Sequence, residues 1–231
     1  MRTLRSAAFM ALWAAWTGLF GLTIPLLWAC GSPPMAIRRF SRVWARGVLA
    51  LLAVVVGLRF VVRGGPSAQV APRLIVGNHQ STWETVAALV LFPDVAIVTK
   101  RELLRIPVMS WYLRRSPMII IDRDDRRAVR EMLVQSRAAL KTGRSVLIFP
   151  EGTRTPPDGA IRFKRGVEWL YRGLDVEATP VAWDAGRFWP PGGGPTGHGI
   201  VTVTMLTEIP PGLPPGEFVR RAETAIEGAL T

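Results

Sequence analysis

Two long apolar stretches dominate the first quarter of the chain. The first, over residues 7–30, holds no charged residue and is long enough to cross a bilayer. The second covers residues 48–62 and is interrupted only by Arg59. The segment between them carries Arg38, Arg39, Arg42 and Arg46. This pattern predicts a membrane-associated pair of helices within residues 1–62.

The arginines between the two stretches constrain how such a pair would sit in a membrane. A simple spanning hairpin with a cytoplasmic catalytic domain would place them outside, against the positive-inside rule. We therefore expect both helices to dip into one leaflet, with the arginines on anionic head groups. Three alternatives stay open: a second stretch that is a buried core helix, a first stretch that is a signal peptide, or a lipidated Cys30.

The remainder of the chain, residues 63–231, alternates between short apolar runs and amphipathic segments. After a Gly/Pro/Ser linker over 63–73, strands are expected at 74–76, 95–99, 118–121, 146–149, 178–183 and 200–206. Helices are expected at 81–91, 102–115 with a break at Pro107, from Asp124 or Asp125 to Gly143, at 166–171 and at 217–230. Such alternation predicts an α/β domain whose mixed, mostly parallel sheet is flanked by helices.

The charge balance narrows the choice of partner. The 231 residues contain 29 Lys and Arg against 17 Asp and Glu, a net charge of +12. A chain this basic requires an anionic partner, and no nucleic-acid-binding motif is present. The nine tryptophans favour a membrane interface instead. A single cysteine excludes an intrachain disulfide, which fits a reducing compartment.

The stretch LIVGNHQSTWE over residues 74–84 holds the clearest candidate for chemistry. His79 follows a short strand, and Glu84 lies five residues on, in the first turn of the next helix. A histidine held by a carboxylate is a general base, able to take a proton from a substrate hydroxyl. The alternative is a capping box, with Ser81 at the N-cap and Glu84 satisfying backbone N–H groups. Cys30 lies in the apolar segment and His198 in a Pro/Gly loop, so neither is a candidate nucleophile or base.

Several predicted strands are followed by charged or polar residues, with one glycine among them. They are Lys100, Asp122, Arg123, Glu151, Gly152, Thr153 and Arg154. Ligands of open α/β sheets bind at the carboxyl ends of strands, and arginine suits phosphate. A glycine there lets the backbone approach a ligand closely. The alternative is that each cation is a solvated loop charge.

Taken together, these blocks resemble a known family. Asn78 and His79 with a carboxylate five residues after the histidine, KREL over 100–103, IDR over 121–123, FPEGTR over 149–154 and Pro180 follow one another in order. The set looks like that of the glycerolipid acyltransferases of the 1-acylglycerol-3-phosphate type, over about residues 74–182. Three positions depart from the usual pattern: Glu84 stands for Asp, Pro117 for Gly and Thr155 for Ser.

The resemblance implies roles for individual residues. His79 would be the general base and Glu84 its orienting carboxylate. The glycerol phosphate would be bound by Arg123, Glu151, Gly152, Thr153 and Arg154, with Lys100 adding charge. Pro180 would lie near the acyl donor.

The implied reaction passes an acyl chain from acyl-CoA or acyl carrier protein to the sn-2 hydroxyl of lysophosphatidate, giving phosphatidate. It needs no metal and no cofactor besides the donor. The implied location is the inner membrane, with the catalytic domain on its cytoplasmic face. Open alternatives are another acceptor such as a lyso-ornithine lipid, a phospholipid hydrolase, and a phospholipid-binding module without turnover.

Overall fold

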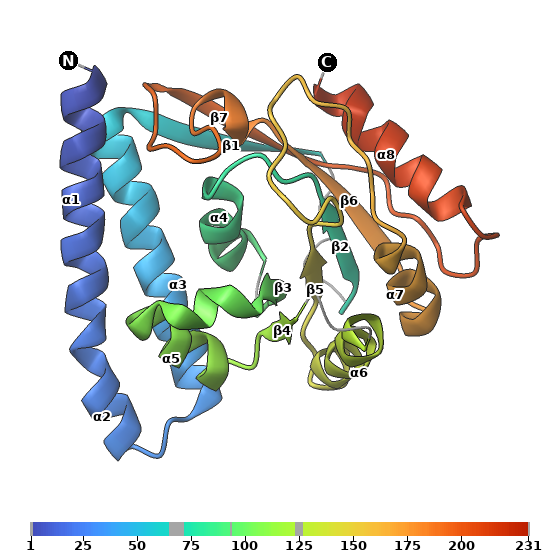
Figure 1. The fold of residues 1–231 in the computed structure, drawn as a ribbon, viewed down its shortest axis with the longest axis horizontal. Coiled ribbons are helices and arrows are strands. Elements are labelled where there is room, and N and C mark those ends of the chain that lie inside the picture. The colour runs from blue at the N-terminus through green and yellow to red at the C-terminus, as the bar shows by residue number, and fades with distance from the viewer. Residues whose placement is uncertain (1, 65–71, 93, 123–126, 231) are drawn as a thin grey trace.

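The computed structural model describes residues 2–64, 72–92, 94–122 and 127–230, which form one sheet between two layers of helices (Figure 1). Its seven strands are β1 (Leu58–Gly64), β2 (Leu74–Gly77), β3 (Ala96–Lys100), β4 (Ile119–Ile121), β5 (Val146–Ile148), β6 (Ala178–Trp183) and β7 (Gly199–Met205). They lie in the order β1-β7-β6-β2-β5-β3-β4. Among these seven strands, only β6 and β7 pair antiparallel. The predicted mixed, mostly parallel sheet is confirmed.

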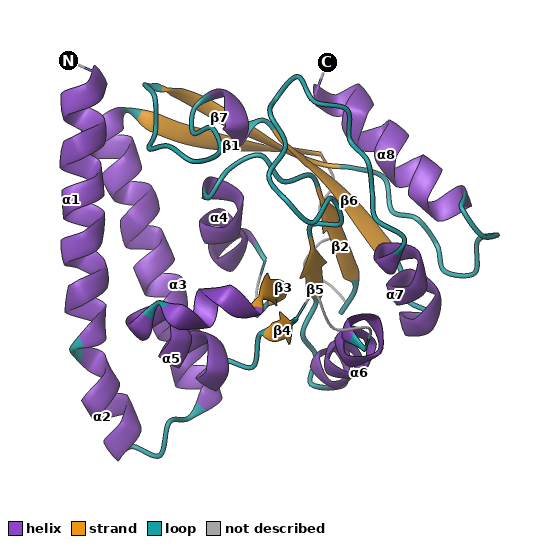
Figure 2. Ribbon diagram, viewed as in Figure 1, coloured by secondary structure: helices purple, strands orange, loops and turns teal. Residues whose placement is uncertain are grey.

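Helices cover both faces of this sheet (Figure 2). One layer contains α1 (Arg2–Gly21), α2 (Thr23–Ala29), α3 (Pro34–Leu51) and α4 (Trp83–Leu91). The other contains α6 (Ala128–Lys141), α7 (Gly166–Leu174) and α8 (Glu217–Leu230). Between β3 and β4 lie a 3₁₀ turn (Arg101–Arg105) and α5 (Pro107–Arg115), so the break expected at Pro107 is confirmed. Each layer has its own apolar cluster against the sheet.

The second apolar stretch is not the helix expected over 48–62. Helix α3 begins at Pro34, passes through the arginine-rich segment and continues as a π-helical turn over Leu52–Val56. Gly57, in the left-handed region with φ 82°, then ends the helix. The next residues form β1, whose backbone pairs with β7 across the expected domain boundary between 62 and 63. The β-branched valines of β1 suit a strand better than a helix.

The buried-core alternative describes the first part of that stretch. Val48, Leu52 and Val56 are almost fully buried in the cluster that α1 and α4 share with the sheet. Of the four arginines, Arg38 forms an ion pair with Asp94, and Nε of Arg42 donates to the carbonyl of Leu89 at 3.3 Å. Two of the expected head-group ligands therefore contact the protein itself.

Helices α1 and α2 keep the character of a membrane segment. Residues Thr3–Ala29 form the one stretch, within the described residues, long and apolar enough to cross a bilayer by length and composition. Only 11% of its most apolar window is buried. The buried side carries Phe9, which packs against Trp189, while Leu4, Leu22 and Leu26 lie exposed on other parts of the surface.

Candidate active site

The site begins where β2 ends. Gly77 is the last residue of the strand, and a Cβ there would lie 2.4 Å from Nε1 of Trp183, so only glycine fits. The next residue, Asn78, is fully buried and bonded to the backbone of Trp183 in β6. Its Nδ2 donates to the Trp183 carbonyl at 2.9 Å, and its Oδ1 accepts the Trp183 N–H at 2.8 Å. The turn that carries His79 is thereby fixed to the neighbouring strand.

His79 and Glu84 face each other across this turn. Nδ1 of His79 lies 3.2 Å from Oε2 of Glu84, whose side chain is fully buried. The same carboxylate accepts the N–H of Ser81 at 2.8 Å and that of Gln80 at 3.2 Å. The hydroxyl of Ser81 in turn accepts the N–H of Trp83, at 3.1 Å. The capping and imidazole contacts therefore coexist, and the regular helix begins at Trp83 rather than at Ser81.

The turn after β5 holds the backbone of His79 on both sides. The His79 N–H donates to Oε1 of Glu151 at 2.8 Å, and the His79 carbonyl accepts the N–H of Thr155 at 2.8 Å. The imidazole stacks on the ring of Phe149, with centroids 4.4 Å apart and planes 21° from parallel. The sequence patterns gave no role to Asn78, Phe149 or Thr155, although all three fall within or beside the motifs.

Two buried carboxyl groups meet at this turn. Burial raises the pKa of Glu84, against the opposing effect of the hydrogen bond and charge of His79. Burial also raises the pKa of Glu151 to about 7; the bond from the His79 N–H lowers it and the charge of Glu84 raises it further. The second oxygen of Glu151, Oε2, is buried without a hydrogen-bond partner. Glu151 thus contacts the candidate base and does not lie open to a ligand.

The other residues expected to bind phosphate lie around the same turn or at a neighbouring strand end. Thr153 and Arg154 are exposed, and Lys100 ends β3 with its side chain exposed. Arg123 lies outside the described residues. Gly152 has φ +74°, and a Cβ there would lie 2.9 Å from Nζ of Lys164. Lys164, which the motifs did not single out, therefore adds a cation directly over the glycine.

A sequence model of the acyltransferase family matches residues 59–184, which is more than half of the chain. The chain belongs to the acyltransferase family. The match begins within β1 and ends just after β6, so it includes the turns that hold His79, Glu84 and Arg154.

Several curated relatives carry the name 1-acyl-sn-glycerol-3-phosphate acyltransferase. One from Pseudomonas aeruginosa is 37% identical over 163 residues, covering 70% of this chain and 63% of that protein. The human beta enzyme is 30% identical over 158 residues, covering 67% of this chain and 57% of its own. The matched region thus spans less than two thirds of either relative.

A solved structure shares the whole fold. The crystal structure of PlsC from Thermotoga maritima, described as an LPA acyltransferase, superposes with a TM-score of 0.73. The alignment covers 100% of this chain and 96% of the other, at 22% sequence identity. The shared fold therefore includes the N-terminal helices and the C-terminal helix as well as the sheet.

Proposed function

We propose that this protein transfers an acyl chain from an acyl thioester to the sn-2 hydroxyl of 1-acylglycerol-3-phosphate, giving phosphatidate. The observation that carries the proposal is the contact between Nδ1 of His79 and Glu84, beside the cationic turn that contains Gly152 and Arg154. The names of the relatives support the same acceptor.

In this mechanism His79 is the general base. Its Nδ1–H donates to Glu84, which leaves Nε2 to accept the proton of the sn-2 hydroxyl as that oxygen attacks the thioester carbonyl. The tetrahedral oxyanion collapses, the carbon–sulfur bond breaks, and the thiolate takes the proton from the imidazolium. General-base catalysis of this kind contributes roughly 10²–10⁴-fold to the rate. A covalent acyl-enzyme is not required.

The acceptor phosphate would lie over the turn after β5. Arg154 supplies a forked donor, Gly152 lets the backbone come close, and Thr153 offers a hydroxyl. Lys100 and Lys164 would add positive charge, and we assign Arg123 to phosphate binding as its motif suggests. Glu151 we assign to holding the His79 backbone, since a carboxylate would repel the phosphate.

Lysophosphatidate and phosphatidate both reside in the membrane. Helices α1 and α2 would insert their exposed leucines into one leaflet of the inner membrane, with the catalytic domain on the cytoplasmic side. Acyl-CoA or acyl carrier protein would deliver the chain from that side. No further cofactor enters the mechanism.

The test is acyl transfer from palmitoyl-CoA or palmitoyl-acyl carrier protein to lysophosphatidate by the purified chain in mixed micelles. The wild type should form phosphatidate, and His79→Ala should lose at least about 10²-fold in kcat. His198→Ala, at an exposed loop position, is the matched control and should keep full activity. Transfer to a different lysolipid only would overturn the acceptor, and release of free fatty acid would indicate a hydrolase. Phosphatidate binding without any turnover would leave a binding module.

A further inference from the structure

The outer surfaces of α6 and α7 carry exposed cations together with exposed apolar side chains. Trp169 is 64% exposed, Val134 60% and Val129 40%. The exposed cations on the same two helices and their N-caps are Arg127, Arg130, Arg137, Lys141, Arg165 and Arg172. We name these nine residues the α6–α7 patch. Within the described residues 127–141 and 165–174, the one exposed carboxylate is Glu131.

The two helices present this surface as a rigid unit. A Cβ on Gly173 would lie 2.7 Å from Leu133, so the glycine allows α7 to pack closely on α6. Arg137 crosses between them and donates from Nε and Nη2 to the carbonyl of Gly173, at 3.1 and 2.7 Å. Gln135 ties α6 to the sheet, because its amide pairs with both the N–H and the carbonyl of Ile120 in the edge strand β4.

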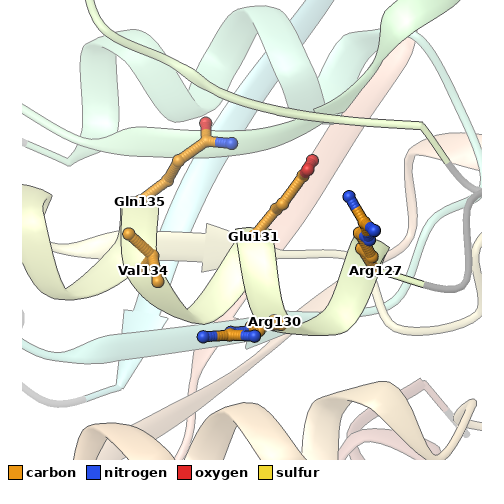
Figure 3. Close-up of a pocket in the computed structure, with 5 residues that line it drawn as sticks. All are labelled: Arg127, Arg130, Glu131, Val134 and Gln135. Carbon is orange, nitrogen blue, oxygen red and sulfur yellow. The ribbon is translucent and has the colours of Figure 1, made fainter.

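The surface of α6 is also hollowed. A depression of about 440 Å³ is lined by Arg127, Arg130, Glu131, Val134 and Gln135 (Figure 3). It lies beside the patch and shares three of its residues. Two of its five lining residues are arginines, a residue type that is enriched in binding hot spots.

The patch borders the candidate active site. Lys164, which lies against Gly152, immediately precedes Arg165 and α7, and its N–H donates to the carbonyl of Pro150 at 3.0 Å. Arg165, at one end of the patch, is thus the neighbour in sequence of Lys164, which lies against the turn that contains Gly152. A partner seated there could extend a flexible arm toward His79.

The sheet separates this patch from the helices expected to meet the membrane. Helices α1 to α3 pack on one face of the sheet, and α6 to α8 on the other (Figure 1). A bilayer that receives the exposed leucines of α1 and α2 therefore leaves the outer face of α6 and α7 in water. A water-facing cationic surface with an exposed tryptophan suits an acidic protein partner.

Resting on the proposed function, we propose that the α6–α7 patch docks an acyl carrier protein, a small acidic helical protein that holds the acyl chain as a thioester on a phosphopantetheine arm. The cations attract its acidic surface, and Trp169 and Val134 form the apolar contact. Delivery of the arm past Lys164 places the thioester at His79. Coenzyme A lacks a protein surface, so it cannot contact Trp169, Val134 and the cations of both helices together as a carrier protein would.

The kinetic test compares two donors in one assay. Arg130→Glu combined with Arg172→Glu should lower kcat/KM for palmitoyl-acyl carrier protein at least about tenfold, and leave palmitoyl-CoA within about twofold. Trp169→Ser should act in the same direction. Arg220→Glu, the same charge reversal at an exposed position of α8, is the matched control and should change neither. Equal losses with both donors, or no loss with either, would overturn the proposal.

A binding test separates this proposal from the proposed function. Because Cys30 is the chain's one cysteine, Cys30→Ser with Val129→Cys allows one environment-sensitive dye to be placed in the patch while Trp169 and Val134 stay in place. Its emission should shift on addition of palmitoyl-acyl carrier protein, less so at high salt, and not with phosphatidylglycerol vesicles. A shift with vesicles alone would overturn the proposal in favour of a lipid surface. A shift with the carrier protein in a chain that transfers no acyl group would support the docking and overturn the function.

Discussion

Replacing Glu84 with glutamine separates its capping role from its role as the charge beside His79, because the change removes the charge while keeping the shape. Glu84 accepts three N–H groups, from Ser81, Gln80 and the imidazole of His79. The glutamine oxygen can keep the two that share Oε2, at 2.8 and 3.2 Å, which leaves its NH₂ facing the N–H of Gln80. The Gln80 N–H and the new NH₂ are then two buried donors that face each other.

The expected magnitudes differ strongly between folding and catalysis. An unsatisfied buried donor costs about 1–3 kcal/mol, and the desolvation that raises the pKa of Glu84 is relieved in the neutral amide. This relief offsets part of the cost of the two donors, so the net loss of stability should lie within that range. The imidazolium formed during the reaction, by contrast, loses its buried counter-charge. We expect kcat to fall about 10²–10⁴-fold, with little change in the KM for lysophosphatidate.

The assay is steady-state transfer to lysophosphatidate alongside thermal unfolding of the same preparations. His79→Ala sets the lower limit of activity. Glu84→Asp, which carries the family's usual residue, keeps the charge and should retain more activity than Glu84→Gln. If Glu84→Gln kept wild-type kcat while His79→Ala was inactive, Glu84 would be a helix cap only and the dyad would be refuted.

Three further predictions follow from the same turns. Gly152→Ala places a side chain in the left-handed region against Lys164, which should cost about 1–2 kcal/mol by denaturant unfolding and raise the KM for lysophosphatidate; unchanged KM would exclude the turn from acceptor binding. Glu151 has a folded pKa of about 7 against an ordinary 4.5, so its contribution to stability is full below pH 4.5 and lost as pH rises through 7. Glu151→Gln should remove this loss, with a difference from wild type approaching ~3 kcal/mol above pH 7; parallel pH–stability curves would contradict it. Asn78→Ala should leave two backbone groups of Trp183 unpaired, at about 1–3 kcal/mol each, measured by thermal unfolding; a neutral result would show that water replaces the amide.

The regular elements of the α/β domain were predictable because their patterns are local. Short β-branched runs mark β2, β5 and β6, and the terminal helix has the expected bounds, Glu217–Leu230. The helix predicted over residues 48–62 was wrong because hydropathy alone does not distinguish the end of a buried helix from an edge strand. Apart from Arg59 the stretch 48–62 is apolar, and glycine, which at Gly57 ends the helix, is also common inside membrane helices.

The site shows the same division. The pairing of His79 with Glu84 follows from a spacing of five residues across one turn, so it was visible in the sequence. The contacts of Asn78 with Trp183 and of Glu151 with His79 join residues 105 and 72 positions apart. Only the strand order brings these positions together, and no local pattern records it. The contact of Glu151 with the backbone of His79 is one that its motif did not suggest.

The hydrogen bonds between the turn after β5 and the backbone of His79 connect acceptor binding with the rate of turnover. The loop that would receive the phosphate also holds the N–H and the carbonyl of the base, through Glu151 and Thr155. A bound phosphate that steadies this loop would steady the imidazole as well, so part of the binding energy is realised as rate. A lysolipid without the phosphate should then have a lower kcat as well as a higher KM, and its low turnover would persist at saturating concentration.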